Sequence, residues 1–250
     1  MRPLLSIIIP AYNEAENFRA GLLEPARKFL AKQKYPWEVI FVNDGSTDET
    51  KELLTKFCQK HSKYKVMTIS HGGKAAAVTA GMLAAKGEIV LFTDFDQSTP
   101  LDQVADFIKA HKNGAGVAIG LRGVKEETKD DTIFRKIRSW AFVFLVQAAL
   151  LPGIKDSQCG FKSFKRQFVK PIFSNLKVTN TGKVSGSYMG AFDVEALFLA
   201  KKLGAKIDQV PVSWVKIVSN RLNFWKEPLQ MAIDVLKVRI YDLLGKYNHL

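Results

Sequence analysis

The feature of this sequence that most restricts its fold is a regular alternation of apolar, β-branched runs with amphipathic stretches of helical length. Continuous apolar runs separated by helices predict a mainly parallel sheet that is covered by helices on both faces. The predicted strands are Leu4–Ile9, Val39–Val42, Val66–Ile69, Ile89–Thr93 and Gly116–Leu121. The predicted helices between them are Glu14–Ala31, Thr47–Lys60, Lys74–Lys86 and Leu101–Lys112.

The second half of the chain has a different pattern. The apolar stretch Trp140–Leu151 contains only Gln147 as a polar residue, and it is shorter than the about 20 residues that cross a bilayer. It is therefore either a buried helix or a helix that lies in a membrane interface. Further on we expect a helix at Phe192–Leu203, a strand at Ile207–Val215 and a terminal helix at Glu227–Tyr247.

Composition narrows the classes of protein. The 250 residues are 47% hydrophobic and 24% charged, which is globular composition and excludes a disordered tail or a disulfide-stapled miniprotein. Cys58 and Cys159 form no zinc-ligand spacing, which fits a reducing, cytosolic compartment. The opening MRPLLSIIIP lacks the small-residue cleavage site of a signal peptide and is interpreted as a first strand.

The charge of the chain predicts an anionic partner. Lys and Arg number 37 against 24 acids, a formal net charge of +13. Such an excess favours a nucleic acid, a phosphorylated substrate or an acidic membrane surface. Nucleic acid is the weakest of these interpretations, because the chain has no basic stripe interleaved with aromatic residues.

The predicted sheet points to its own ligand site, because ligands of parallel sheets bind beyond the carboxyl ends of the strands. Thr93-Asp94-Phe95-Asp96 stands at such an end. Two carboxylates at a strand end suit Mg²⁺ or Mn²⁺ shared with substrate phosphates, although an Asp-x-Asp pair alone is also common in solvated loops. We predict Asp94 and Asp96 as metal ligands.

The turns after the other predicted strands support this site. In the turn Val42–Asp48, Asp44 is placed to accept hydrogen bonds from a base or a ribose, whereas Ser46, Thr47 and Asp48 are explained as caps of the next helix. His71–Lys74 reads HGGK, a glycine turn at a helix start that either binds an anion or is an ordinary turn.

Together these segments resemble a known family. "IIIPAYNE", "VNDGSTD" and "GGKAAAVTAGMLAAKGEIVLFTDFD" resemble the nucleotide-sugar domain of inverting family 2 glycosyltransferases with the GT-A fold. "DSQCGFKSFKR", "AFDVEALFLAKKLGAKIDQVPVSW" and the "GLRG" turn resemble the dolichyl-phosphate β-glucosyltransferase branch more than the related mannosyltransferases. The resemblance implies an α/β GT-A domain over residues 1–250, with a nucleotide-sugar half (1–121) and an acceptor half (122–250).

The resemblance also implies roles for individual residues. In the donor half, the nucleotide-contacting residues are Pro10, Tyr12, Glu14, Asp44 and Lys74, and the metal and diphosphate residues are Asp94 and Asp96. Phe95 departs from the small residue that members often carry between these acids. In the acceptor half, the implied phosphate-holding residues are Arg122, Arg135 (or Arg138) and Ser139, and the acceptor-side residues are Asp156, Gln158, Lys162 and Glu195.

Two positions leave alternatives open. The mannosyltransferases carry a further Arg near Ile217, for which Lys216 or Arg221 are possible stand-ins here. Glu195 is either the family's helix acid or a surface acid that pairs with Lys201 or Lys202. We interpret Cys159 as a small core residue.

The implied reaction is metal-dependent, inverting transfer of a hexose, glucose from UDP-glucose, to a polyprenyl or dolichyl phosphate. The alternatives are a GDP-mannose donor or a saccharide acceptor. A phosphate acceptor is largely dianionic at neutral pH, so a general base is secondary, and Asp156 and Glu195 are expected to orient Lys162 or the sugar.

We further expect peripheral attachment to the cytoplasmic face of an anionic membrane, because basic residues flank the apolar helix. These are Lys125, Arg135, Lys136 and Arg138, with Lys237, Arg239 and Lys246 on the terminal helix. The sequence leaves the oligomeric state open.

Overall fold

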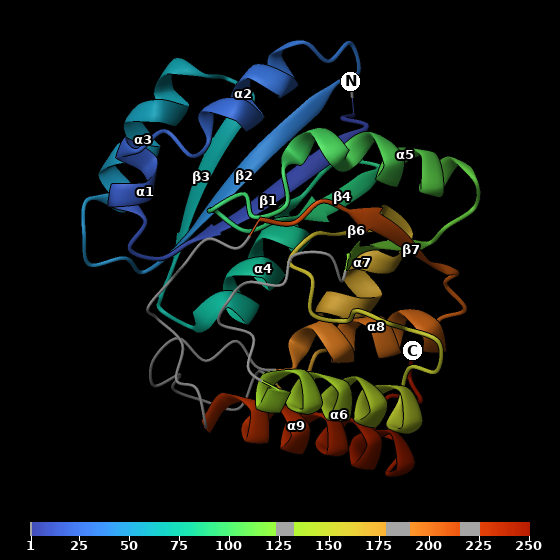
Figure 1. The fold of residues 1–250 in the computed structure, drawn as a ribbon. Coiled ribbons are helices and arrows are strands. Elements are labelled where there is room, and N and C mark those ends of the chain that lie inside the picture. Colours follow the sequence, from blue (N-terminus) through green and yellow to red (C-terminus); the bar gives the residue numbers. More distant parts are fainter. Residues whose placement is uncertain (1, 124–132, 179–190, 216–225) are drawn as a thin grey trace.

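The computed structural model describes residues 2–123, 133–178, 191–215 and 226–250, without the side chains of 133–138 and 226–228. The centre of the fold is a seven-stranded sheet of order β3-β2-β1-β4-β6-β5-β7 (Figure 1). Its strands are β1 Leu5–Ala11, β2 Trp37–Asp44, β3 Tyr64–Ile69, β4 Ile89–Phe92, β5 Val117–Arg122, β6 Lys162–Lys165 and β7 Ile207–Val212.

The predicted parallel sheet is confirmed, with one exception. The pairs β1–β2, β1–β4, β2–β3 and β5–β7 are parallel, whereas β6 is antiparallel to both β4 and β5. The sequence pattern did not reveal β6, because a strand that contains Lys162 and Ser163 does not read as a buried apolar run. Both residues are nevertheless fully buried.

The predicted helices are present with shifted ends. They are α1 Ala15–Arg19, α2 Glu24–Ala31, α3 Thr50–Lys60, α4 Gly73–Ala84, α5 Val104–Lys112, α6 Ile133–Ala149, α8 Phe192–Lys202 and α9 Lys226–Leu243. Helix α7 Arg166–Phe173 was not predicted, and a short 3₁₀ turn lies at Leu101–Gln103. The single helix expected over Glu14–Ala31 is wrong. The chain breaks between α1 and α2, where Gly21 adopts φ 76°, a conformation that glycine enters at little cost.

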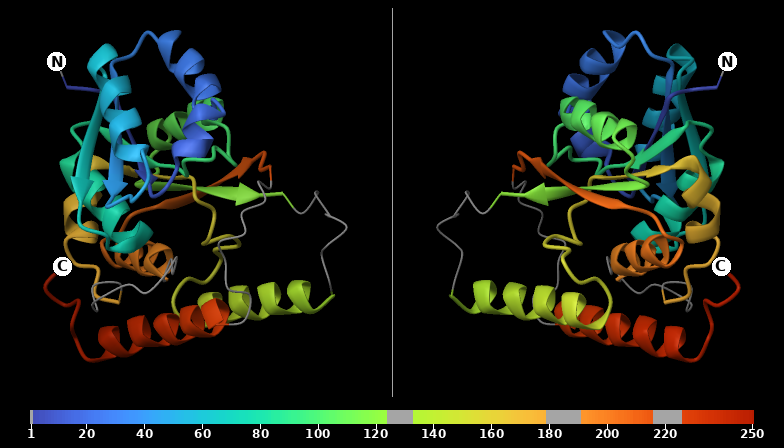
Figure 2. Two further views of the ribbon diagram at one scale, coloured as in Figure 1. Left: turned by 90° about the vertical axis from the view of Figure 1, so that its left-hand side faces the viewer. Right: turned by 90° about the vertical axis from the view of Figure 1, so that its right-hand side faces the viewer.

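Side chains alternate between the two faces of the sheet and build two cores. Ile8, Val42 and Phe92 belong to the core that includes α4, α7 and α8, whereas Ile7 and Phe41 belong to the core that includes α2 and α5. Figure 2 shows the resulting layers, with α6 and α9 lying side by side beyond α8. The sheet is therefore covered on both faces, as strands without a polar face require.

Helices α6 and α9 form an outer layer with an exposed apolar face. Val146 and Leu150 at the end of α6 are buried, but Trp140 and Phe144 are 79% and 74% exposed. The fully buried alternative for this stretch is therefore wrong. α9 carries a second row at helical spacing, consisting of Leu229, Ile233, Leu236, Ile240 and Leu243. Within the described part of the chain, no helix has both the length and the hydropathy that crossing a bilayer requires.

The carboxyl-terminal residues are tied to the middle of the fold. The hydroxyl of Tyr247 donates to Oε1 of Glu195 on α8 at 2.6 Å, and both residues are fully buried. Backbone N–H groups of Lys177 and Val178 donate to the same carboxylate. Glu195 is thus not a surface acid, and burial raises its pKa despite these donors.

Removing this hydroxyl tests how strongly the link stabilises the fold. Tyr247→Phe is expected to lower the free energy of unfolding by about 1–3 kcal/mol, because a buried carboxylate loses a donor. Chemical denaturation measures the change. Tyr241→Phe is the matched control, since no hydrogen bond of its hydroxyl is found in the described residues. Equal effects of the two substitutions would contradict the assignment.

Candidate functional site

The candidate site lies where the order of strands reverses. From β1 the chain continues to β2 and β3 on one side, and β4 then pairs with the other side of β1. Such a switch point opens a crevice at the carboxyl ends of the strands. β4 pairs with β1 only as far as Ile8 opposite Phe92, so Pro10 lies beyond this pairing, where it interrupts no bond to β4.

The predicted acidic pair follows β4 directly. Asp94, which is one-third exposed, forms a salt bridge with the ammonium of Lys74 at the start of α4. Asp96 accepts a hydrogen bond from the backbone of Ser98 at 2.9 Å. Burial opposes the charge of Lys74, but Asp94 and Asp193 outweigh it and raise the pKa of Lys74. The structure thus brings together Lys74 and Asp94, two of the predicted site residues.

Phe95 between the two acids has a structural explanation. Its side chain is 3% exposed and lies 6.4 Å from the ring of Phe41, in the core on the α2 face of the sheet. Phe95 thus packs the turn after β4 against this core, while Asp94 and Asp96 remain partly exposed. The departure from the family's usual small residue therefore adds core contact at this turn.

Gly160 packs directly against the acidic pair. A Cβ atom at this position would overlap the carboxylate of Asp94. Gly160 belongs to the segment that precedes β6, so this contact brings the second half of the chain against the turn after β4. Glycine is required here for close approach rather than for an unusual backbone angle.

A second ion pair, between Lys162 and Asp193, is buried within the fold close enough to Lys74 for Asp193 to affect its pKa. Lys162 is fully buried, and its ammonium donates to Asp193 Oδ1 at 2.7 Å and to the carbonyl of Cys159. The same ammonium lies 5.4 Å from the centroid of the Phe92 ring. Lys162 is therefore held by protein groups, and its predicted contact with an acceptor stays a prediction.

Arg122 and Asp156 form a third pair. The guanidinium donates from Nε and Nη2 to the two carboxylate oxygens at 2.7 and 2.8 Å, a bidentate geometry. Asp156 also accepts from the backbone of Gln158 and Cys159. Burial alone would raise the pKa of Asp156, but Arg122 lowers it, so the carboxylate is anionic and orients Arg122 rather than Lys162.

The turn after β2 holds the turn after β1. Ser46 accepts from the backbone of Asn13, Thr50 accepts from that of Glu14, and Asp48 accepts from that of Ala15. Asp48 also accepts from the backbone of Thr50, the first residue of α3, whereas the N-cap position is Glu49, which forms no side-chain cap hydrogen bond. Ser46 and Thr47 were expected to cap that helix and instead bond to the turn after β1.

Asp44 organises the turn before α4. Its carboxylate accepts from the backbone of Gly72 and Gly73 at 2.8 and 2.9 Å and from Nδ1 of His71 at 2.9 Å. His71 in turn stacks on Tyr12, with ring centroids 4.3 Å apart. The glycine N–H groups that were considered for an anion are thus used by Asp44, and base recognition by Asp44 stays a prediction.

A pocket of about 470 Å³ adjoins Asp96 on the side of α2. Lys28 of α2, Lys32 directly after it, Gln97 and Asp102 contribute to its lining. The predicted metal residue Asp96 is therefore accessible from a cavity whose lining carries both lysine and aspartate side chains.

The residues present fit a divalent cation that is shared with substrate. Asp94 and Asp96 supply the hard oxygen atoms that Mg²⁺ and Mn²⁺ prefer. No third His, Cys, Asp or Glu joins them among the residues that the structure describes. A cation at this pair would complete its coordination with substrate and water oxygens, as Mg²⁺ commonly does.

Several predicted residues lie elsewhere or outside the described part. Ser139 is exposed on α6, and Glu195 faces Tyr247. Lys125, Lys216, Ile217 and Arg221 are outside the described residues, as are the side chains of Arg135, Lys136 and Arg138. Cys159 is confirmed as a core residue; it is fully buried, and burial raises the pKa of its thiol.

Sequence reasoning missed Asp193 and Gly160, and it singled out the HGGK turn without the contacts of His71 to Asp44 and Tyr12. A usable signal existed for Asp193. It stands in the mostly apolar run Ala191–Ala200 at the start of α8, where a charge that becomes buried has to be paired inside the protein. The contacts of Gly160 and His71 depend on segments distant in the chain.

The fold and the site define a GT-A glycosyltransferase. The family model described as "Glycosyl transferase family 2" matches residues 6–173, so the chain belongs to that family. The dolichyl-phosphate beta-glucosyltransferase of Dictyostelium discoideum is 34% identical over 96% of this chain and 75% of its own length. The Homo sapiens protein of the same description is 33% identical over 98% and 77%.

A solved structure supports the fold. The glucosyl-3-phosphoglycerate synthase from Mycobacterium tuberculosis, in complex with Mn²⁺, uridine-diphosphate and glucosyl-3-phosphoglycerate, superposes with a TM-score of 0.59 at 19% identity. The match covers 98% of this chain and 80% of that one.

The Arg122–Asp156 pair gives a stability prediction. Arg122→Leu leaves the carboxylate of Asp156 unpaired and is expected to lower the free energy of unfolding by about 3–5 kcal/mol. The double variant Arg122→Leu/Asp156→Asn is expected to recover most of this loss. Because the folded-state pKa of Asp156 is depressed below 3.8, the pair stabilises the fold above that pH and the deficit of the single variant shrinks as the solution is acidified. Denaturation at pH 7 and pH 3 measures both effects; a deficit independent of pH would contradict the pairing.

Proposed function

We propose that this protein transfers glucose from UDP-glucose to a polyprenyl or dolichyl phosphate, with inversion at the anomeric carbon and with Mg²⁺ or Mn²⁺. The observation that carries the proposal is the charged cluster at the switch point, where Lys74 pairs with Asp94 and Lys162 pairs with Asp193. The names of the two relatives, both dolichyl-phosphate beta-glucosyltransferases, support glucose as the transferred sugar and dolichyl phosphate as the acceptor. The Mn²⁺ and uridine-diphosphate of the structural neighbour support the donor and the metal.

In the proposed reaction an acceptor phosphate oxygen forms a bond to C1 of the glucose as the bond from C1 to the UDP oxygen breaks. The acceptor is largely dianionic near neutral pH, so no proton has to be removed before attack. No free carboxylate base is therefore needed, which agrees with the engagement of Asp156 by Arg122. Attack from the opposite face of the sugar gives a β-linked product from an α-linked donor.

The residues of the chain would orient two phosphate-bearing substrates. Tyr12, His71 and Asp44 offer an aromatic pair and a carboxylate beside the first turns, suited to a nucleoside. Lys74 offers an ammonium next to the acidic pair. A divalent cation held by Asp94 and Asp96 would neutralise charge that develops on the diphosphate. Arg122, oriented by Asp156, is placed in the half proposed for the acceptor.

The test is incubation with labelled UDP-glucose or GDP-mannose, a short polyprenyl phosphate and Mn²⁺, followed by lipid extraction. Label is expected in the lipid phase with UDP-glucose, and Asp96→Ala is expected to abolish it, with Asp106→Ala on α5 as the acid control. Transfer of mannose instead would replace the donor assignment. Full activity of Asp96→Ala, or label in a saccharide only, would overturn the proposal.

The contact between Gly160 and Asp94 gives a finer prediction for the same assay. Gly160→Ala is expected to lower kcat by about 100-fold, because the added methyl group displaces the carboxylate of Asp94. Gly153→Ala adds the same group where nothing lies within 4 Å; at φ 86° it is expected to lower stability but to leave kcat of the folded enzyme unchanged. Similar losses in both variants would refute a local effect on Asp94.

We further propose that the apolar face of α6 and α9 attaches the enzyme to the cytoplasmic face of an anionic membrane, where a polyprenyl acceptor resides. Exposed Trp140 and Phe144 on α6 and the apolar row on α9 support this orientation. Lys237 and Arg239 beside this row pair with Asp234 and Asp242, so the apolar contacts are expected to carry more of the attachment there.

Trp140→Ser/Phe144→Ser is expected to lower sedimentation with anionic liposomes by about tenfold or more, because two large apolar side chains no longer enter the interface. The control Ala141→Ser/Ala148→Ser changes exposed small residues on the same helix. Added salt should weaken binding of the wild-type protein as well, since basic residues flank the helix. Unchanged sedimentation of the Trp140/Phe144 variant would count against attachment by α6.

A further inference from the structure

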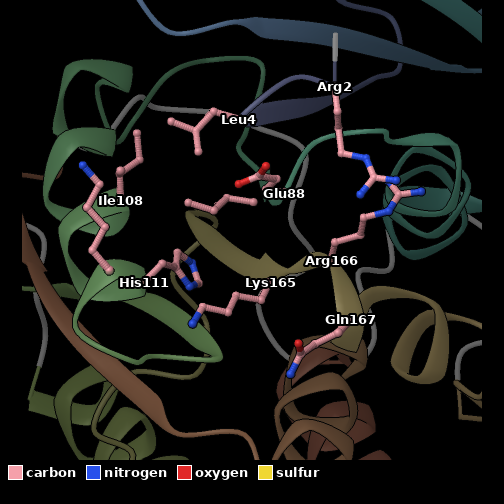
Figure 3. Close-up of a pocket in the computed structure, with 10 residues that line it drawn as sticks. Arg2, Leu4, Glu88, Ile108, His111, Lys165, Arg166 and Gln167 are labelled. Atoms are coloured by element: carbon pink, nitrogen blue, oxygen red, sulfur yellow. The ribbon is translucent and has the colours of Figure 1, made fainter.

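The structure contains a second charged cavity, at the edge of the sheet opposite to the candidate site (Figure 3). It has a volume of about 650 Å³ and lies at the amino ends of β1 and β4, beside Leu4 and Ile89. The antiparallel direction of β6 brings the end of that strand, Lys165, to the same edge. The cavity is therefore separate from the acidic pair after β4.

Cations dominate the lining of this cavity. Arg2, Lys112, Lys165 and Arg166 line it, and Glu88 is the one acid among its lining residues. In the described part of the chain Arg2, Lys112 and Lys165 form no ion pair, and Arg166 donates to the backbone carbonyl of Ala85 at 3.0 Å. In Figure 3 the side chains of Arg2 and Arg166 extend toward one another. Like charges that converge repel each other, and an anion between them would relieve that repulsion.

His111 contributes no charge to the cavity. Its Nδ1 lies 2.9 Å from the carbonyl of Ala115, to which it donates, and its Nε2 lies 2.7 Å from the hydroxyl of Ser163, from which it accepts. Both nitrogens are therefore used by the fold, and because burial lowers the pKa of His111 the ring is neutral near pH 7. The positive charge comes from Arg and Lys side chains alone, which stay charged throughout the neutral range.

Part of the lining of the cavity is apolar, and this selects the ligand class. Leu4, Ile89 and Ile108 contribute apolar side chains to it. A hollow with both charged and apolar lining suits a small molecule with an anionic end and an uncharged body. A nucleic acid would need an extended basic stripe instead. A membrane would need exposed apolar side chains, and those gather on α6 and α9.

We propose that this cavity binds a small organic phosphate, whose phosphate group lies between Arg2 and Arg166 and whose uncharged body lies along the apolar part of the lining, toward Lys165. The planar guanidinium groups of Arg2 and Arg166 match the geometry of phosphate oxygens. The site is independent of the transfer reaction and of its substrates.

The test measures acetylation of individual lysines by mass spectrometry while AMP or inorganic phosphate is titrated, with saturating UDP present throughout to occupy the proposed donor site. AMP is expected to slow acetylation of Lys112 and Lys165 saturably, and to do so at about tenfold lower concentration than inorganic phosphate, because its base covers apolar surface. Lys109, one turn before Lys112 on α5, is the internal control and should react at an unchanged rate.

Arg166→Glu is expected to weaken the protection of Lys112 by AMP by about tenfold or more, because a guanidinium that binds the phosphate is lost, and Lys109→Glu should leave it unchanged. Arg2→Ala, at an exposed position before β1, serves if Arg166→Glu lowers the melting temperature. The proposal is overturned if AMP gives no saturable protection, if it acts no better than inorganic phosphate, or if Lys109→Glu weakens it equally.

Discussion

The ammonium of Lys162, enclosed within the protein, is the constraint on which the rest of the site depends. A buried charge is tolerated only when it is paired and hydrogen-bonded, so β6, β4 and α8 must meet where Asp193, the carbonyl of Cys159 and the ring of Phe92 surround it. Gly160 lies between Cys159 and β6 and contacts Asp94. The position of the acidic pair after β4 therefore follows from an ion pair formed by the second half of the chain.

Helix α8 connects this ion pair to the carboxyl-terminal layer. Asp193 and Glu195 are two positions apart, so they point to nearly opposite sides of the helix. Asp193 meets Lys162, whereas Glu195 meets Tyr247, which follows α9. Both acids are buried and hydrogen-bonded, so a displacement of the α6–α9 layer would also displace the first turn of α8. The apolar outer layer and the charged cluster are thus parts of one packed unit.

The sequence predicted the parallel strands and the carboxyl-edge location of the site because both depend on local patterns, namely apolar runs and the turns that end them. It did not predict β6, whose polar residues are buried by long-range pairing, or the break at Gly21 inside an otherwise helical pattern. At the site, the residue types Asp94, Lys74, Arg122 and Asp156 were recognised, but their partners were not. Pairing of Arg122 with Asp156 joins segments distant in the chain, which no local spacing specifies.

The cations of the protein are used in two different ways. At the switch point Lys74, Lys162 and Arg122 are each paired with a carboxylate, which fixes their directions and leaves little net charge. A transfer between two anionic substrates needs such orientation more than it needs attraction, since misplaced donors stabilise a transition state poorly. At the amino edge of the sheet Lys112 and Lys165 are unpaired within the described structure, which gives attraction without fixed orientation. That arrangement suits binding rather than catalysis. The two charged regions of the sheet are therefore expected to differ in role, with transfer at the switch point and ligand binding at the amino edge.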